Sequence, residues 1–320
     1  MNDHWSRKRQ ILNCLTHQYF VSGEVIAKNL SLTRAAINQH IDGLKDYGIE
    51  IYSVKGKGYK LANPISLVVE SQLVNAIDNR CFYFDDTNST NAFMLSHAAE
   101  FKSGDICVAE YQSAGRGRRG RQWISPYGHH IYASLFWRFT QDISQASGLS
   151  LVVGCAIVKA LQDFGVEDLG LKWPNDIYLD HKKLAGILIE VSQTSSQYTD
   201  LVIGFGINMS MSAEQGELID QPWSDLSTMA SMPDKTALLI KLHSQLKRDL
   251  QLFEQHGLTE FATRWNEHDL FINREVTLMM SPNSVTGVCR GIDSQGAILL
   301  ENEQGINAFV GGEISLRAAQ

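Results

Sequence analysis

The chain has 320 residues, of which 44% are hydrophobic and 20% are charged, and it contains six prolines. This composition excludes a disordered or fibrous protein and predicts roughly two or three ordered domains. Five scattered cysteines without a Cys-x-x-Cys pair argue against a disulfide framework and a structural zinc site. The polar start MNDHWSRKRQ is unlike a signal peptide and no apolar stretch is long enough to span a bilayer, so we expect a cytoplasmic protein.

Charge is distributed unevenly along the chain. Residues 1–62 hold nine Lys and Arg against five Asp and Glu, a net charge of +4, whereas the remainder holds 19 against 30, a net charge of −11. Neutralisation of phosphates supplies most of the non-specific affinity of a protein for DNA. The sequence therefore predicts that only the basic amino-terminal part meets nucleic acid.

Residues 22–47 have the pattern of two consecutive helices with a short break at Ser31 and Leu32. Ser22 and Thr33 are predicted to cap the two helices and to lie among the DNA-contacting groups. The second helix leaves outside four polar side chains suited to base edges and phosphates, namely Arg34, Asn38, Gln39 and Lys45. This pattern predicts a helix-turn-helix, and a small helical subdomain with a solvated polar face is the alternative.

The stretch IEIYSVKGKGYKLA predicts two short strands around a basic tight turn. It resembles the wing of winged-helix DNA-binding domains, in which Lys55 and Lys57 would contact phosphate beside the groove. Pro64 follows closely and indicates a linker. We therefore expect a winged-helix DNA-binding domain at 1–63.

The middle of the chain alternates strand-like and helix-like segments, which predicts an α+β sheet that carries functional loops. Strands are expected at 80–86, 105–112, 131–139 and 198–210 and, within 169–192, as two strands joined through Asp180 and His181. Helices are expected from about Thr90, over 147–165 and near 236–268, and about five short strands follow them.

The segment AGRGRRGRQW at 114–123 places four arginines among three glycines. Alone it allows three interpretations: an RNA-binding segment, a solvated turn, or a loop for phosphate and carboxylate. Two apolar strands and Trp123 flank it, which favours a loop anchored over a sheet. Because glycines allow close approach and let successive N–H groups point at one anion, we predict a loop that closes over a small anionic ligand.

Four motifs occur in one order and spacing: GRGRRGRQW, KWPNDIYL at 172–179, KKLAGILIE at 182–190 and GFGIN at 204–208. Together with the winged helix, they resemble the biotin–protein ligases, in particular those that also repress the biotin operon. The resemblance covers the whole chain. It implies a central mixed-sheet domain of the class II synthetase kind at 64–270 and an SH3-like β-barrel at 271–320.

The resemblance also implies an activity. Such enzymes activate biotin with ATP and Mg²⁺ to biotinyl-5′-adenylate and transfer biotin to a lysine of the biotin carboxyl carrier protein of acetyl-CoA carboxylase. With bound adenylate they act as homodimeric repressors on operator DNA. We expect the arginine loop to become ordered over the adenylate and to complete a dimer surface.

Site residues carry over by position. Biotin contacts are implied for Ser89, Thr90, Asn91, Gln112, Gly115, Arg116, Gly117, Arg118, Trp123, Lys183, Gly186, Leu188 and Gly204. Nucleotide contacts are implied for Arg118, Arg119, Arg121, Asn175, Asp176, Lys183, Asn208, Met211 and Trp223. Lys183, Arg116 and Arg118 are the expected catalytic cations, because the transition state gathers negative charge at the α-phosphorus. Asp176 is the candidate magnesium ligand, and a turn residue is its alternative.

Two rival functions stay open from the sequence. A transcription factor could sense a small acid without converting it, although Lys183 and the intact arginine loop argue against this. A lipoate-type ligase would share the fold and the adenylate chemistry, and the GRGRRG and KWPND motifs favour biotin through resemblance.

Overall fold

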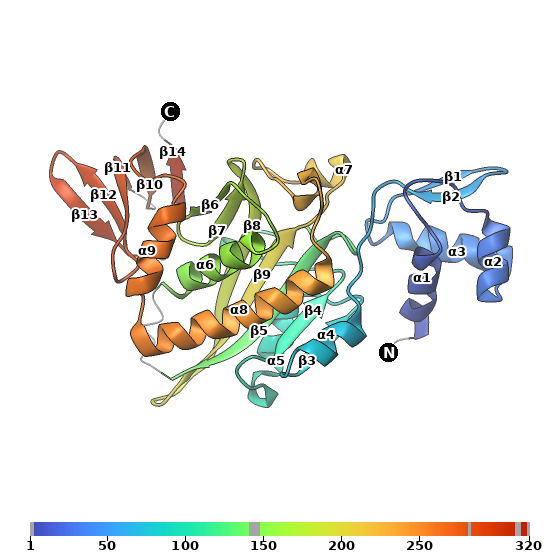
Figure 1. Ribbon diagram of the computed structural model, residues 1–320, viewed down its shortest axis with the longest axis horizontal. Coiled ribbons are helices and arrows are strands. Elements are labelled where there is room, and N and C mark those ends of the chain that lie inside the picture. The colour runs from blue at the N-terminus through green and yellow to red at the C-terminus, as the bar shows by residue number, and fades with distance from the viewer. Residues whose placement is uncertain (1–2, 141–147, 281–282, 311–314, 319–320) are drawn as a thin grey trace.

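The computed structural model describes residues 3–140, 148–280, 283–310 and 315–318. Figure 1 shows an amino-terminal head, a central body built around the largest sheet, and a carboxyl-terminal sheet at the end of the molecule opposite the head. Among the described residues, no helix combines the length and the apolar character needed to cross a membrane.

The head is a helix-turn-helix followed by a hairpin. It consists of α1 (Asp3–Asn13), α2 (Gly23–Leu30), α3 (Arg34–Lys45) and the antiparallel strands β1 (Ile51–Val54) and β2 (Gly58–Leu61). The predicted helix caps are confirmed, because the Ser22 and Thr33 hydroxyls accept hydrogen bonds from the backbone N–H of Glu24 and Ala36. The core of the head includes the buried apolar residues Ile26, Ile37, Ile41 and Leu44, so the polar face of α3 points outward.

The body contains a mixed sheet of seven strands in the order β3-β4-β5-β9-β8-β7-β6. The strands are β3 (Cys81–Phe84), β4 (Ile106–Ala109), β5 (His130–Phe139), β6 (Leu169–Lys172), β7 (Asp176–Leu179), β8 (Lys182–Thr194) and β9 (Thr199–Asn208). Strands β3 and β4 are parallel, and the other neighbours are antiparallel. Strand β9 is buried at every position, which places it at the centre of the core.

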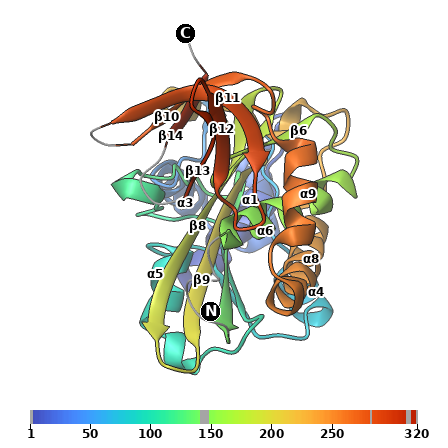
Figure 2. The same cartoon turned by 90° about the vertical axis from the view of Figure 1, so that its left-hand side faces the viewer.

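Helices cover both faces of this sheet. Helices α6 (Leu149–Gln162) and α8 (Lys235–His256) pack on one face, and α5 (Thr90–Ser96) lies on the other, as Figure 2 shows. The remaining helices are α4 (Glu70–Ala76), α7 (Ala213–Gly216) and α9 (Thr259–His268), with short 3₁₀ turns at 98–100, 118–120 and 226–228. The first residues of α5, Thr90 and Asn91, contact strands β5 and β8 of the sheet.

The segment 169–192 forms three strands, where two were expected. Strands β7 and β8 are joined through Asp180 and His181, as predicted, and both of these residues have positive φ. The additional strand β6 pairs with β7 across a turn that contains Pro174. Proline has no N–H for a sheet hydrogen bond, so an apolar stretch that contains it breaks into two strands.

The carboxyl-terminal part forms an antiparallel sheet in the order β13-β12-β11-β10-β14. Its strands are β10 (Glu275–Met279), β11 (Ser284–Ile292), β12 (Ile298–Asn302), β13 (Gly305–Phe309) and β14 (Ser315–Ala318). The five predicted strands are confirmed, but among the described pairings none joins β13 to β14, so the sheet is not seen as a closed barrel. Its buried residues, such as Val276 and Leu300, belong to the same core as the body.

The head is joined to the body by a buried charge cluster. Arg9 of α1 pairs with Asp85 at 2.9 Å and approaches Glu110 at 3.4 Å, and Glu110 pairs with Lys235 of α8 at 2.6 Å. The side chains of Glu110 and Lys235 are fully buried. Because an unpaired buried charge is costly, each member of the cluster requires its partners to remain in place.

Candidate functional site

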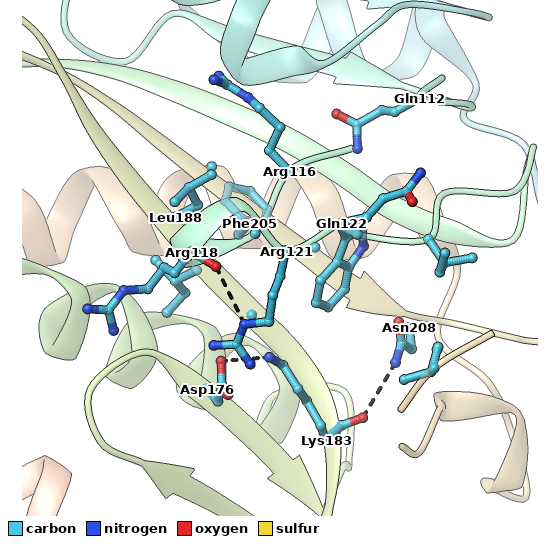
Figure 3. A pocket seen from close by; sticks show the side chains of 18 of the residues that line it. Gln112, Arg116, Arg118, Arg121, Gln122, Asp176, Lys183, Leu188, Phe205 and Asn208 are labelled. Carbon is cyan, nitrogen blue, oxygen red and sulfur yellow. Dashed lines mark hydrogen bonds and ion pairs between the residues drawn. The ribbon is translucent and has the colours of Figure 1, made fainter. Parts of the chain in front are cut away.

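The four motifs of the sequence meet around one cavity of about 270 Å³ above strands β8 and β9. Its lining comes from the start of α5, the arginine segment, the β6–β7 turn, β8, β9 and the loop after β9. Figure 3 shows the side chains that converge on it. Residues as far apart in the sequence as Ser89 and Trp223 therefore form a single site.

One end of the cavity is a polar network made of the buried residues Thr90, Asn91, Ser125 and Ser134 and the half-buried Gln112. The N–H of Thr90 donates to Gln112 Oε1 at 2.9 Å, and Gln112 Nε2 donates to Ser125 Oγ at 3.1 Å. Ser134 Oγ lies 2.7 Å from Thr90 Oγ1 and 2.5 Å from Asn91 Oδ1. Such a network fixes the direction of each donor and acceptor, so it suits a small ligand group that itself has both.

Glycines on β8 and β9 make the room in the middle of the cavity. Gly186 pairs with Gly206, and Leu188 pairs with Gly204. A Cβ atom at Gly204 would lie 2.1 Å from Asn91 Oδ1, and one at Gly206 would lie 2.5 Å from Trp123 Cε2. The absence of side chains at these positions therefore admits Asn91 and the Trp123 indole, which lies over the sheet and lines the cavity.

Residues 115–123 form a small hairpin, which we call the arginine hairpin. Its ends are held by the N–H of Trp123 donating to the Gly115 carbonyl at 2.9 Å, and its tip by the N–H of Gly117 donating to the Arg121 carbonyl at 2.7 Å. Arg118 donates to Asn175 Oδ1 at 3.0 Å. The exposed Arg119, at positive φ, is not among the residues that line the cavity.

Lys183 lies at the opposite end of the cavity from the polar network. Its Nζ pairs with Asp176 Oδ1 at 2.9 Å and lies 5.6 Å from the centre of the Trp123 ring. Figure 3 shows the Arg121 guanidinium above this pair, whereas Arg116 points away from it. Lys183 and Arg121 therefore form a cationic end suited to phosphate, and Arg118, which is held by Asn175, adds positive charge beside it.

The electrostatics of this end follow from burial and from crowding of like charges. Burial lowers the pKa of Arg118, and repulsion from Arg119 and Arg121 acts in the same direction, while Asp176 raises it. A guanidinium has so high an intrinsic pKa that Arg118 keeps its charge. An anion that enters would relieve the repulsion among these cations.

The loop after β9 closes the end of the cavity that holds Lys183. The N–H of Met211 donates to Asp225 Oδ2 at 2.7 Å, and Trp223 Nε1 donates to the Gly216 carbonyl at 3.2 Å. Asn208 Nδ2 donates to the Ser224 carbonyl at 3.0 Å, which ties the loop to the end of β9. The same loop reaches the head, because Gln215 Nε2 donates to the Gly48 carbonyl at 2.8 Å.

On the head, the side chains predicted to meet DNA are exposed. Arg34, Gln39 and Lys45 of α3 are exposed, as are Lys55 and Lys57 in the turn between β1 and β2. Asn38 is also exposed and accepts a hydrogen bond from the Tyr59 hydroxyl of β2, and Lys45 pairs with Asp42 at 3.0 Å. The helix and the hairpin are thus linked into one surface.

The structure brings together all the predicted biotin and nucleotide residues except two, since neither Gly115 nor Arg119 lines the cavity. Functional residues that were not predicted include Gly206, Phe205 and Gln122, which line the cavity, and Ser134 and Glu190, which hold lining residues in place. Strand alternation offers a signal for two of these, because Gly206 and Glu190 each follow a predicted site residue by two positions.

Comparison with known proteins agrees with this architecture. The model of the biotin/lipoate A/B protein ligase family matches residues 82–208, that of an HTH domain matches 7–60, and that of the biotin protein ligase C-terminal domain matches 271–317. Over 312 residues the chain is 43% identical to the bifunctional ligase/repressor BirA of Escherichia coli, covering 97% of each chain. Over 308 residues it is 28% identical to BirA of Bacillus subtilis, covering 93% of this chain and 94% of the relative.

A solved structure extends the comparison to three dimensions. The biotin protein ligase from Aquifex aeolicus in complex with biotin and ATP has a TM-score of 0.64 and 28% sequence identity, and it covers 75% of this chain and 99% of that chain. The shared part is thus large enough to include a whole ligase, while the full-length relatives also share the DNA-binding head. The chain belongs to the bifunctional ligase/repressor branch of the biotin/lipoate A/B protein ligase family.

Proposed function

We propose that the chain activates biotin with ATP to biotinyl-5′-adenylate and then transfers the biotinyl group to a lysine of an acceptor protein. One observation carries the proposal: the Lys183–Asp176 pair, Arg118 and Arg121 form a cationic end opposite a buried polar network in a single cavity. A cavity of this design accepts a ligand with a polar ring at one end and a phosphate at the other. The family assignment supports the same chemistry.

In the first step, a carboxylate oxygen of biotin attacks the α-phosphorus of ATP. The bond between the α-phosphorus and the bridging oxygen breaks, and pyrophosphate leaves with the electron pair. Negative charge gathers around the phosphorus, where Lys183 and the guanidinium groups of Arg118 and Arg121 would stabilise it. We assign Lys183 the largest share, because its Nζ already lies in the cavity, 2.9 Å from Asp176.

In the second step, the amine of the acceptor lysine attacks the carbonyl carbon of the mixed anhydride. An amide bond forms, AMP leaves, and the amine loses its proton. Since the anhydride also reacts with water, the arginine hairpin and the loop at 211–225 would have to cover it between the steps. We propose the biotin carboxyl carrier protein of acetyl-CoA carboxylase as the acceptor.

Magnesium fits this site only as a partner of the nucleotide. The described residues contain no cluster of three His, Cys, Asp or Glu side chains that could hold a metal ion. Magnesium commonly binds through one or two carboxylates together with substrate phosphates. Asp176 is the carboxylate that would hold it, and when bound the ion would neutralise phosphate charge.

The polar network favours biotin over lipoate. The ureido ring of biotin both donates and accepts hydrogen bonds, whereas the dithiolane ring of lipoate has no N–H or O–H group. Thr90, Asn91 and Ser134 are buried, and polar groups are buried only where hydrogen bonds satisfy them. An apolar ring would leave the network facing a group that cannot pair with it.

Magnesium-dependent exchange between ATP and pyrophosphate tests the enzymatic proposal. We expect exchange with biotin, and none with lipoate, octanoate or no acid. The Lys183→Ala variant should lose the exchange while it keeps the thermal stability of the parent. Exchange with lipoate alone would identify a lipoate ligase, and no exchange with any acid from a well-folded protein would identify a sensor.

We also propose that residues 1–63 form the DNA-binding domain of a repressor, and that adenylate binding produces the homodimer that occupies a two-fold symmetric operator. The exposed side chains of α3 and of the β1–β2 turn support DNA binding. Sedimentation at fixed protein concentration, with and without biotinyl-adenylate, tests the dimer, and an unchanged mass would refute it.

A further inference from the structure

Glu190 lies on β8, on the same face of the sheet as the cavity. Successive residues of a strand point to opposite faces, so Glu190 shares the face of Gly186 and Leu188, which line the cavity. The register pairs Leu188 with Gly204 and Glu190 with Val202. On this face of β8, Glu190 is therefore the next residue after Leu188, close to the polar network.

One oxygen of Glu190 accepts two hydrogen bonds from opposite walls of the site. Asn91 Nδ2 donates to Glu190 Oε2 at 2.8 Å, and Arg116 donates to the same atom at 2.8 Å. Asn91 is buried, whereas the Glu190 and Arg116 side chains are 25% and 39% exposed. The carboxylate thus joins the buried polar network to the partly exposed arginine hairpin.

This contact explains the direction of Arg116. Figure 3 shows its side chain pointing away from Lys183 and Asp176, in contrast to Arg121 of the same hairpin. The backbone of Arg116 also forms an isolated antiparallel β-bridge with that of Gln122 across the hairpin. Holding the Arg116 side chain therefore holds the hairpin as a unit, with its backbone over the polar network.

Asn91 gives the contact a second consequence. Its Nδ2 donates to Glu190 and to the Leu188 carbonyl, and its Oδ1 lies 2.5 Å from Ser134 Oγ. An amide has distinct donor and acceptor ends, so the carboxylate of Glu190, together with the Leu188 carbonyl, fixes which end of Asn91 faces Ser134. The orientation of the polar network depends on that choice.

We propose that Glu190 is a positioning residue for biotin: it latches the arginine hairpin through Arg116 and orients the polar network through Asn91. This inference rests on the proposed function. In this proposal the Arg116 guanidinium positions the hairpin and does not take the catalytic role expected from the sequence. Lys183, Arg118 and Arg121 are then the cations that face phosphate.

The test measures KM for biotin and for ATP separately in the exchange reaction, for Glu190→Gln, Glu190→Ala, Arg116→Met and the Glu190→Gln/Arg116→Met double variant. We expect KM for biotin to rise about tenfold in Glu190→Ala and less in Glu190→Gln, which keeps an oxygen acceptor for Asn91. KM for ATP should change by less than about twofold, since neither group faces Lys183. The double variant should be no worse than the worse single variant, because both changes break one contact.

Two further measurements do not depend on turnover. Calorimetry should show the same loss of biotin affinity, and trypsin should cut the arginine hairpin of Glu190→Ala faster than that of the parent in saturating biotin. Glu301→Gln is the matched control, since Glu301 pairs in the carboxyl-terminal sheet with Arg290, which is as exposed as Arg116. It should change none of these readouts.

Distinct results separate the possible failures. Absence of exchange in the parent would refute the proposed function, while calorimetry with biotin would still test the latch. If Glu190→Ala bound biotin as tightly as the parent and trypsin cut its arginine hairpin no faster, the proposed role of Glu190 would be refuted. Equal increases of KM for biotin and ATP, or additive effects in the double variant, would also overturn it, because they would indicate general disturbance of the site.

Discussion

Gly206 offers a direct test of how the cavity is shaped. A Cβ atom there would lie 2.5 Å from Cε2, 2.7 Å from Nε1 and 2.8 Å from Cζ2 of Trp123. Gly186 is the cross-strand partner of Gly206, and a Cβ there would lie 3.0 Å from Cζ3 of the same indole, so the ring rests on both glycines. The Gly206→Ala change therefore presses on the rigid indole at three atoms, and the sheet leaves it little room to slide.

The magnitude follows from these distances. Ordinary contact begins at 3.4 Å, so the indole must retreat by about 0.9 Å. Overpacking of this kind costs about 1–3 kcal/mol, and a displacement of about 1 Å in an active site lowers rates by up to about 10²-fold. We expect kcat/KM for biotin-dependent exchange to fall by about 10- to 100-fold.

Gly43→Ala in α3 is the control, since it adds the same methyl group in ordinary contact, 3.8 Å from Lys8 Nζ. It should leave the exchange unchanged and slightly stabilise the helix. Parent-like exchange in Gly206→Ala, with a fold confirmed by thermal unfolding, would refute the reasoning. It would mean that the Trp123 indole does not shape the biotin slot.

Three further predictions concern catalysis, stability and DNA. Lys183→Ala should lower the exchange rate by about 10²- to 10³-fold at saturating substrates, and an unchanged rate would remove Lys183 from the chemistry. Burial lowers the pKa of His129 to about 4. Its neutral form therefore stabilises the protein fully above its ordinary pKa of 6.5, and this contribution is lost as the pH falls from there toward 4. The free energy of unfolding, measured with urea, should fall between about pH 7 and pH 5 in the parent, and this fall should be about 2 kcal/mol smaller in His129→Asn. The same fall in both proteins would contradict the assignment. Lys57→Ala should lower the dependence of log K on log salt by about 0.9 for a random duplex, measured by anisotropy, and an unchanged slope would show that Lys57 meets no phosphate.

The sequence predicted those features whose signals are local. Ser22 and Thr33 cap their helices because a hydroxyl can accept from an N–H two or three residues further on. The turn of Asp180 and His181 between β7 and β8 could also be predicted locally, because the two strand-like runs leave only those two residues between them. Such signals need no knowledge of what packs against the segment.

Contacts between distant segments could not be predicted in this way. Glu190 reaches Arg116, which is 74 positions away, and Lys235 reaches Glu110 across 125 positions. In the sequence Glu190, Glu110 and Lys235 look like solvated charges, because burial depends on what the rest of the chain places nearby. The same holds for Ser134, which is one polar residue in an apolar strand until α5 brings Thr90 and Asn91 against it.

The pairing of charges in the cavity bears on how it can accept two anionic substrates. Lys183 forms an ion pair with Asp176 and Arg116 forms one with Glu190, while Arg118 donates a hydrogen bond to the amide oxygen of Asn175. Clustered cations repel one another, and these acceptors offset part of that repulsion before any ligand enters. A phosphate bound at Lys183 would exchange with Asp176 and leave no cation newly buried and unpaired, while Arg116 would keep Glu190. Asp176 is the group released by such an exchange at Lys183, which places a carboxylate beside the phosphates where a magnesium ion would need one.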